Sequence, residues 1–273
     1  MALIRLILVR LVCLVCTQIS WVHAVQADTI NVSVLEFCPY VCDPLKENGK
    51  LGFTVDIEKV ILERAGHQVN FDIVPYARSL KGTELGIYDA VGICNDHSSE
   101  VNICSSETIG PMIYTFYVLK DQPWRYTGIE SIKQIVLGTI AGYNLTQISP
   151  EYQDYVEEHE NEKKRVHIHH GKGDLVYRMF KKVELGRIDT FSEASYVAQY
   201  YLNTHNLADK FVDAGRFKKT LWGRICFSPK NPKAQEYVEL IDKGVRKMRA
   251  TGELQTIMES YGLGLWESEI KSK

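Results

Sequence analysis

The cysteines are the side chains whose chemistry depends most on the compartment in which the chain resides. The sequence has seven, and Cys38, Cys42, Cys94, Cys104 and Cys226 lie beyond the N-terminal segment described below. In an oxidising compartment, Cys38–Cys42 and Cys94–Cys104 are the natural local disulfides, although spacing alone does not determine connectivity. The odd number leaves at least one thiol free or paired outside the chain.

Two groups of residues could bind a metal ion instead. Cys38 and Cys42 have a spacing found in zinc sites, but no second pair of cysteines or histidines follows at a matching spacing, so disulfides are the better interpretation. His167 and His169 would project to one face of a strand, next to His170, and could hold copper or zinc. Exposed histidines at a strand end explain the pattern equally well. We therefore predict no metal and no cofactor.

The N-terminal segment has the layout of a secretory signal peptide. Two arginines lie near its start, Leu11 to Val22 is mostly apolar, and Val25 and Ala27 are small residues at the positions that a signal peptidase recognises. The unbroken apolar stretch is well short of the ~20 residues that span a bilayer. We therefore predict a signal peptide over residues 1–27, cleavage before Asp28 and an exported mature chain.

The composition is that of an ordinary globular protein. Of 273 residues, 45% are hydrophobic and 24% charged, which argues against disorder. The 32 basic and 34 acidic side chains nearly balance, so there is no electrostatic footprint for nucleic acid.

Strand and helix patterns alternate along the mature chain. The first series predicts strand Thr29–Phe37, helix Thr54–Ala65, a strand from Val69, helix Ala77–Leu85 and strand Ala90–Cys94. The second predicts strand Ile135–Ile140, a helix from Pro150 to about Asn161, strand Val166–His170 and helix Asp174–Leu185. Strand Ile188–Phe191 and a helix to about Leu202 follow. The chain ends in a predicted helical stretch from Asn231 to Tyr261. This order predicts an α/β protein with two mostly parallel sheets flanked by helices, and a ligand site between two lobes.

Five short motifs occur in a definite order within these elements. They are GFTVDI at 52–57, GIYDAVG at 86–92, GTIAG at 138–142, GRID at 186–189 and MRATGEL at 248–254. The series resembles that of the periplasmic solute-binding proteins of polar amino-acid ABC importers, bacterial extracellular solute-binding protein family 3. The resemblance covers essentially the whole mature chain, and it depends on the order of the motifs rather than on any single one.

The resemblance implies the type II periplasmic-binding fold, in which two crossing strands join two lobes. Lobe 1 would comprise residues 28–118 and 223–273, and lobe 2 residues 119–222. The crossings would lie near Tyr117–Lys120 and Leu221–Phe227. Proteins of this family close on a ligand by hinge rotation, and the closed form is what the membrane partner recognises.

The resemblance also implies which residues bind the ligand in lobe 1. Phe37, Tyr40 and Phe53 occupy the positions of the family's aromatic sandwich, with Tyr76 nearby, and aromatic faces suit a small ligand. Each of these rings could equally be a core residue. Gly92, the last residue of the second motif, is a further ligand-binding candidate.

The arginine that binds the ligand carboxylate in this family is missing. Its T-x-x-R motif falls on Ser98 and Val101, so the hydroxyl is kept and the guanidinium is lost. A valine cannot replace a planar bidentate donor. Either the ligand lacks a standard α-carboxylate or another cation binds it, and Arg78, next to Tyr76, is the nearest candidate by sequence.

Lobe 2 would contribute a backbone cradle and an acid. Gly142, Tyr143 and Asn144 follow a strand, where backbone N–H groups can hold an anionic group. Glu193 lies four residues after Asp189, close to where the family has the acid that receives the ligand amine.

Three functions are compatible with these residues. The leading hypothesis is a monomeric binding protein that captures a small polar, amino-acid-like ligand for an ABC permease, because no nucleophile and base have a spacing that demands catalysis. The second is an enzyme on the same fold, similar to the secreted cyclohexadienyl dehydratases, with Glu193 as general acid. The third is a periplasmic sensor that docks onto a receptor when it binds its ligand.

Overall fold

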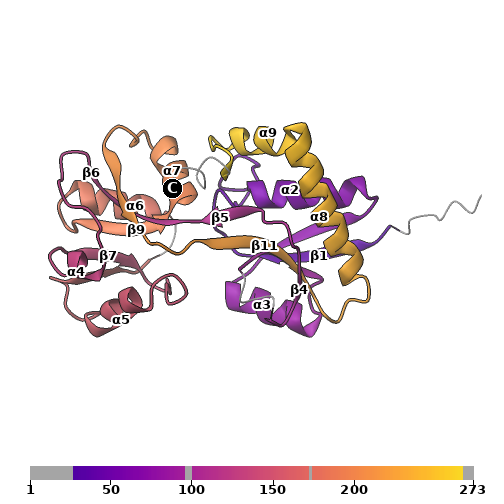
Figure 1. Ribbon diagram of the computed structural model, residues 1–273, viewed down its shortest axis with the longest axis horizontal. Helices are drawn as coiled ribbons and strands as arrows, with labels where there is room; N and C mark the ends of the chain where they lie inside the picture. Colours follow the sequence, from indigo (N-terminus) through magenta and orange to yellow (C-terminus); the bar gives the residue numbers. More distant parts are fainter. Residues whose placement is uncertain (1–26, 96–99, 172–173, 267–273) are drawn as a thin grey trace, which may run out of the picture.

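The computed structural model describes residues 27–95, 100–171 and 174–266. The predicted signal peptide therefore lies outside the described residues, apart from Ala27. The described chain forms two α/β bodies side by side, joined by extended segments (Figure 1). Within these ranges, no helix has both the length and the apolar character needed to cross a membrane.

Lobe 1 is built on a six-stranded mixed sheet. Its order is β2-β1-β3-β11-β4, and β5 also pairs with β11. Its parallel part is β1 between β2 and β3, and β11 then runs antiparallel to β3, β4 and β5. The strands are β1 (Thr29–Val34), β2 (Gln68–Ile73), β3 (Ala90–Cys94), β4 (Ile103–Cys104), β5 (Gly110–Met112) and β11 (Leu221–Phe227).

Four helices belong to lobe 1: α2 (Phe53–Arg64), α3 (Tyr76–Leu85), α8 (Ala234–Thr251) and α9 (Glu253–Ser260). Gly52 precedes α2 with a φ of 102°, and a Cβ there would lie 2.3 Å from the carbonyl oxygen of Tyr40. Only glycine fits this position, which gives the first residue of the GFTVDI motif a structural role. On α8, a Cβ at Gly244 would lie 2.5 Å from Ile61, so the glycine allows α8 to pack closely against α2.

Lobe 2 is built on a five-stranded mixed sheet in the order β10-β6-β9-β7-β8. Strand β7 is parallel to both of its neighbours, whereas β6 is antiparallel to β9 and β10. The strands are β6 (Tyr114–Leu119), β7 (Leu137–Ile140), β8 (Val166–His169), β9 (Thr190–Ala194) and β10 (Phe211–Arg216). The helices are α4 (Ile129–Ile132), α5 (Pro150–Glu158), α6 (Leu175–Glu184) and α7 (Ser195–Thr204).

The helices of lobe 2 begin and pack as their sequences predict. The Ser149 hydroxyl accepts a hydrogen bond from the Tyr152 amide at the start of α5, with Pro150 in the first turn. On α6, Val176, Phe180 and Val183 lie on one face and are buried.

Two segments connect the lobes. They continue from β5 and β11, which pair with each other at the edge of lobe 1 (Figure 1). The first crossing lies between Met112 and Tyr114, earlier than the expected Tyr117–Lys120. Tyr114 already pairs with Ala194 on β9, and the strand continues in the lobe 2 sheet to its end. An apolar run such as this one contains nothing in its sequence that marks the residue at which the chain leaves one sheet for the other.

Helix α7 of lobe 2 also packs directly against lobe 1. The ring of Tyr196 lies 6.1 Å from the ring of Tyr40 and 6.1 Å from that of Phe53. The Tyr196 hydroxyl donates to the carbonyl of Gly264, 3.0 Å away. One hydrophobic cluster therefore runs through both lobes.

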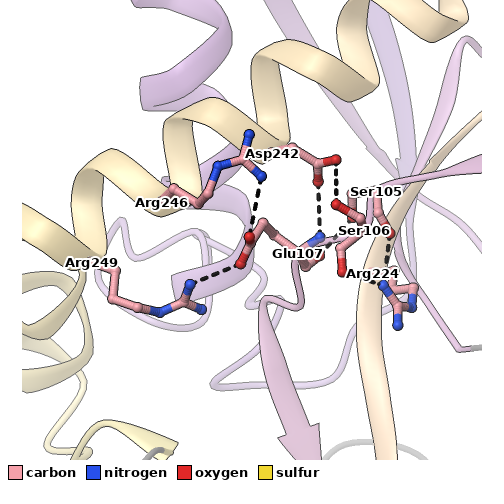
Figure 2. A network of polar contacts seen from close by, with 7 residues as sticks. All are labelled: Ser105, Ser106, Glu107, Arg224, Asp242, Arg246 and Arg249. Carbon is pink, nitrogen blue, oxygen red and sulfur yellow. Dashed lines mark hydrogen bonds and ion pairs between the residues drawn. The ribbon is translucent and has the colours of Figure 1, made fainter.

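A polar network fastens the lobe 1 ends of the crossing segments to α8 (Figure 2). The buried Asp242 of α8 accepts hydrogen bonds from the Ser106 hydroxyl (2.6 Å) and the Glu107 amide (2.9 Å). Arg246 and Arg249 donate to the Glu107 carboxylate at 3.3 and 2.8 Å. On the other side, Arg224 of β11 donates to the Ser106 carbonyl, 2.6 Å away.

The disulfide prediction is confirmed for one pair and wrong for the other. Cys38 is bonded to Cys42. The Cys94 and Cys104 sulfurs are 4.0 Å apart, and Cys226 is within bonding distance of both. Because β11 lies between β3 and β4, its cysteine stands between the other two. A cysteine sulfur forms one S–S bond, so Cys226 pairs with Cys94 or with Cys104.

Candidate functional site

A cavity of about 910 Å³ lies between the lobes. Lobe 1 contributes the segment after β1, the start of α3 and the end of β3. Lobe 2 contributes the loop after β7, the start of α6 and one face of α7. In both sheets, the lining segments follow the carboxyl ends of parallel strands, where ligands bind in open α/β sheets.

Aromatic side chains from both lobes line this cavity. Phe37 and Tyr76 come from lobe 1, and Tyr114, Tyr143 and Tyr201 come from lobe 2. Three of the predicted residues, Phe37, Tyr76 and Tyr143, thus lie where a ligand could contact them.

Tyr40 and Phe53 lie elsewhere. Both side chains are fully buried, their rings are 4.8 Å apart, and neither lines the cavity. The Tyr40 hydroxyl donates to the carbonyl of Pro111 (2.5 Å), which ties it to the first crossing segment. In this structure the two rings are part of the core beneath Tyr196, and their predicted contact with a ligand stays a prediction.

Glu193 is buried behind the cavity wall. Its carboxylate accepts hydrogen bonds from the Tyr143 hydroxyl (2.9 Å) and the Ala194 amide (2.8 Å). It does not line the cavity. Burial raises the pKa of Glu193 to about 7, although its two hydrogen bonds stabilise the charged form. A ligand amine could reach this acid only if Tyr143 moved.

One backbone donor of the predicted anion cradle after β7 is used within the loop. Gly142, Tyr143 and Asn144 all line the cavity. However, the Tyr143 amide donates to the carbonyl of Ile140 (3.0 Å), and the Asn144 side-chain oxygen accepts from the Thr146 amide (3.0 Å). The Tyr143 amide therefore stabilises the turn and is not free to bind an added anion.

The other predicted lobe 1 residues that the structure describes do not line the cavity. Arg78 is exposed on α3. Gly92 is buried in β3, where a Cβ would lie 2.7 Å from Val34 and 3.0 Å from the Glu58 carboxylate, so the glycine serves packing. Ser98 lies outside the described residues. Val101 is 51% exposed.

Sequence reasoning missed the charged residues of the cavity: Glu36, Lys46, Glu47 and Asp174. Glu36, Lys46 and Glu47 follow β1, and Asp174 directly precedes α6. Their positions beyond the carboxyl ends of strands were the available signal.

Of the two predicted candidate metal groups, Cys38 and Cys42 are bonded to each other and offer no thiolate. Among the described residues, Cys94, Cys104 and Cys226 form the only group of three or more potential ligands, with sulfurs within 4.8 Å of one another. His167 and His169 are half-buried on β8, and the Lys182 amine lies 3.4 Å from His167. Burial and Lys182 lower the pKa of both histidines.

Comparisons with known proteins identify the fold. No family model matches the sequence, and no curated protein matches it either. A solved structure from work on glutathione import through GshT and the cystine ABC importer TcyBC of Streptococcus mutans has a TM-score of 0.66 at 16% identity, over 88% of this chain and 97% of that one. The probable amino-acid ABC transporter extracellular-binding protein ytmK of Bacillus subtilis has a TM-score of 0.65 at 18% identity, over 86% and 98%.

A histidine kinase sensor domain with similarity to periplasmic binding proteins is also similar, with a TM-score of 0.62 at 16% identity, over 87% of this chain and 98% of that chain. These TM-scores establish the fold, and the low identities leave the ligand open. The chain has the two-lobed fold of the periplasmic solute-binding proteins of amino-acid importers.

Proposed function

We propose that this protein is a periplasmic solute-binding protein. It captures a small polar, amino-acid-like solute between its lobes and delivers it, as a monomer, to an ABC permease. The observation that carries the proposal is the 910 Å³ cavity with walls from both lobes. The two crossing segments give the lobes a hinge, so a ligand that contacts both walls stabilises the closed form.

Structures with this fold support solute binding. They include an ancestral arginine-binding protein bound to arginine, with a TM-score of 0.61 at 20% identity, over 85% of this chain and 97% of that one. The cleavage of residues 1–27 is part of the same proposal.

A thermal-shift screen of the exported protein tests the proposal. The panel contains the twenty amino acids, small amines and dipeptides, and a ligand of the folded state raises the melting temperature. Replacing Tyr76 and Tyr143 together by alanine should abolish the shift without unfolding the protein, whereas Lys247→Ala, an exposed change on α8, should leave it intact. No shift with any compound, and no ligand retained from the cell, would refute the proposal.

The position of Glu193 favours binding over the dehydratase alternative. A general acid must come within hydrogen-bond reach of its substrate, and the Tyr143 hydroxyl is bonded to this carboxylate at 2.9 Å. Incubation with prephenate and arogenate tests this choice, because formation of phenylpyruvate or phenylalanine would favour the enzyme.

The partner decides between delivery and signalling. The similar kinase sensor domain shows that this fold also occurs in receptors. Chemical cross-linking in the native cell, with and without the bound solute, should capture a permease subunit. Capture of a receptor kinase alone would favour the sensor.

A further inference from the structure

The charges that line the cavity are mostly negative. The described lining contains the carboxylates of Glu36, Glu47 and Asp174 and a single cation, Lys46. The amine of Lys46 is already paired, at 2.7 Å from Glu36 and 3.2 Å from Asp43. Glu47 in lobe 1 and Asp174 in lobe 2 therefore remain without a matching cation on the described wall.

Asp174 lacks a donor for one of its oxygens. Its Oδ2 lies 3.1 Å from His205 Nε2, whereas Oδ1 is buried and has no hydrogen-bond partner among the described residues. An unsatisfied buried acceptor costs free energy. A ligand that brings an N–H donor to this oxygen would recover that cost. Across the cavity, Glu47 accepts a hydrogen bond from the Tyr200 hydroxyl and keeps capacity for another donor.

The pKa of the Tyr201 hydroxyl is affected by several negative charges near the cavity. Its ring lines the wall. Burial is the main cause that raises the pKa of its hydroxyl, and the carboxylates of Asp174, Glu47, Glu193 and Glu36 raise this pKa further. Three of these acids, Asp174, Glu47 and Glu36, also line the cavity, so the wall next to this hydroxyl carries negative charge from both lobes.

The aromatic side chains of the cavity also favour a cationic ligand. Phe37, Tyr76, Tyr114 and Tyr143 line the cavity together with Tyr201. A cation held against such faces is stabilised by the ring quadrupole. A carboxylate would find no bidentate guanidinium partner, because no arginine lines the described wall.

We propose that the cavity binds an organic cation with N–H donors, an amine or a guanidine, and that an α-carboxylate on this ligand is not required. Asp174 and Glu47 hold the cationic group from opposite lobes, and the rings cover its carbon chain. This assignment rests on the proposed function and narrows its ligand class.

Matched pairs of probes test the assignment by calorimetry. Each pair has the same cationic end with and without the carboxylate: arginine and agmatine, lysine and cadaverine, ornithine and putrescine. In at least one pair, the decarboxylated member should bind as tightly as the amino acid or more tightly. Citrulline, which lacks the charge of arginine, and choline, which lacks N–H donors, should each bind at least tenfold more weakly than the best probe.

Two variants locate the binding to the acids. Asp174→Asn and Glu47→Gln should each lower the affinity for the tightest-binding amine at least tenfold. Glu130→Gln, which removes an exposed carboxylate on α4 in lobe 2, is the control and should leave the affinity unchanged. The melting temperature of each variant without ligand shows whether it is folded.

The outcomes separate this inference from the proposed function. An amino acid that binds tenfold tighter than its amine, or an acidic or neutral amino acid as the tightest ligand, would overturn the inference and leave the solute-binding function standing. Unchanged affinity of both acid variants for the best amine would also overturn it. Failure of every amine and amino acid to bind would refute both.

Discussion

A single buried acid, Glu58, makes the stability of lobe 1 depend on pH. Its side chain is 0% exposed, and neither carboxylate oxygen has a hydrogen-bond partner among the described residues. Burial raises the pKa of Glu58 to about 8 from its ordinary value of 4.5. The folded state therefore holds this proton more tightly than the unfolded state, and the protein is less stable at high pH.

The sign of this effect gives the first prediction. Below pH ~4.5 both states are protonated and Glu58 has no pH-dependent effect. As the pH rises towards 8, each unit costs up to about 1.4 kcal/mol of unfolding free energy. The advantage of Glu58→Gln over the native chain in urea unfolding should therefore grow by about 3 kcal/mol between pH 5 and pH 8.

The matched control for Glu58 is Glu63→Gln, which removes an acid from the exposed part of the same helix, α2. Its difference from the native chain should change little with pH. If the Glu58→Gln difference were equally constant, the buried carboxyl would not titrate as described.

At the scale of elements, the sheet order determines the disulfides. Strand β11 places Cys226 opposite Cys104, with Cα atoms 4.0 Å apart, and 6.6 Å from the Cα of Cys94. Non-reducing peptide mapping of the alkylated protein should find Cys226 bridged to one of these two and the third alkylated. A Cys94–Cys104 bridge with Cys226 alkylated would contradict this sheet order.

Helix α8 carries the second prediction at this scale. Asp242→Ala leaves the Ser106 hydroxyl and the Glu107 amide without their acceptor, next to the crossing segment (Figure 2). We expect a loss of about 2–3 kcal/mol in urea unfolding, since hydrogen bonds to charged groups are the stronger class.

Arg246→Ala is the control for Asp242→Ala, because it removes an arginine that is 56% exposed from the same network, at a cost below about 1 kcal/mol. Equal losses in the two variants would mean that Asp242 does not fasten this segment to α8.

How far the sequence predicts these elements depends on local signals. Helices α2 and α5 and strand β3 lie within a few residues of their expected bounds, because periodicity, a cap or a following glycine marks them. Strands β4, β5 and β10 were not predicted. They are short or amphipathic edge segments whose pairing is set by distant parts of the chain, and the same long-range pairing brings Cys226 to Cys94.

The same contrast applies to the site. The aromatic cavity residues Phe37, Tyr76 and Tyr143 follow from motif positions, whereas the burial of Tyr40 and Phe53 depends on Tyr196, which comes from the other lobe. The acid Asp174 was not singled out because its importance arises from the cavity that two lobes form together.

At the scale of the whole molecule, the central claim is that the two lobes form a trap that closes on a solute. The lobes are joined by two crossing segments and by the packing of α7 on lobe 1 (Figure 1). Opening must separate the Tyr200 hydroxyl of lobe 2 from the Glu47 carboxylate of lobe 1, which are hydrogen-bonded in this structure. A bound solute that contacts both walls adds to this cost of opening and so shifts the population towards the closed form.

Small-angle X-ray scattering of the purified protein, without ligand and saturated with its tightest binder from the panel, tests this claim most directly. We predict that the radius of gyration decreases on saturation, since the lobes spend more time closed. A radius of gyration that is unchanged at saturating ligand would contradict a trap that closes.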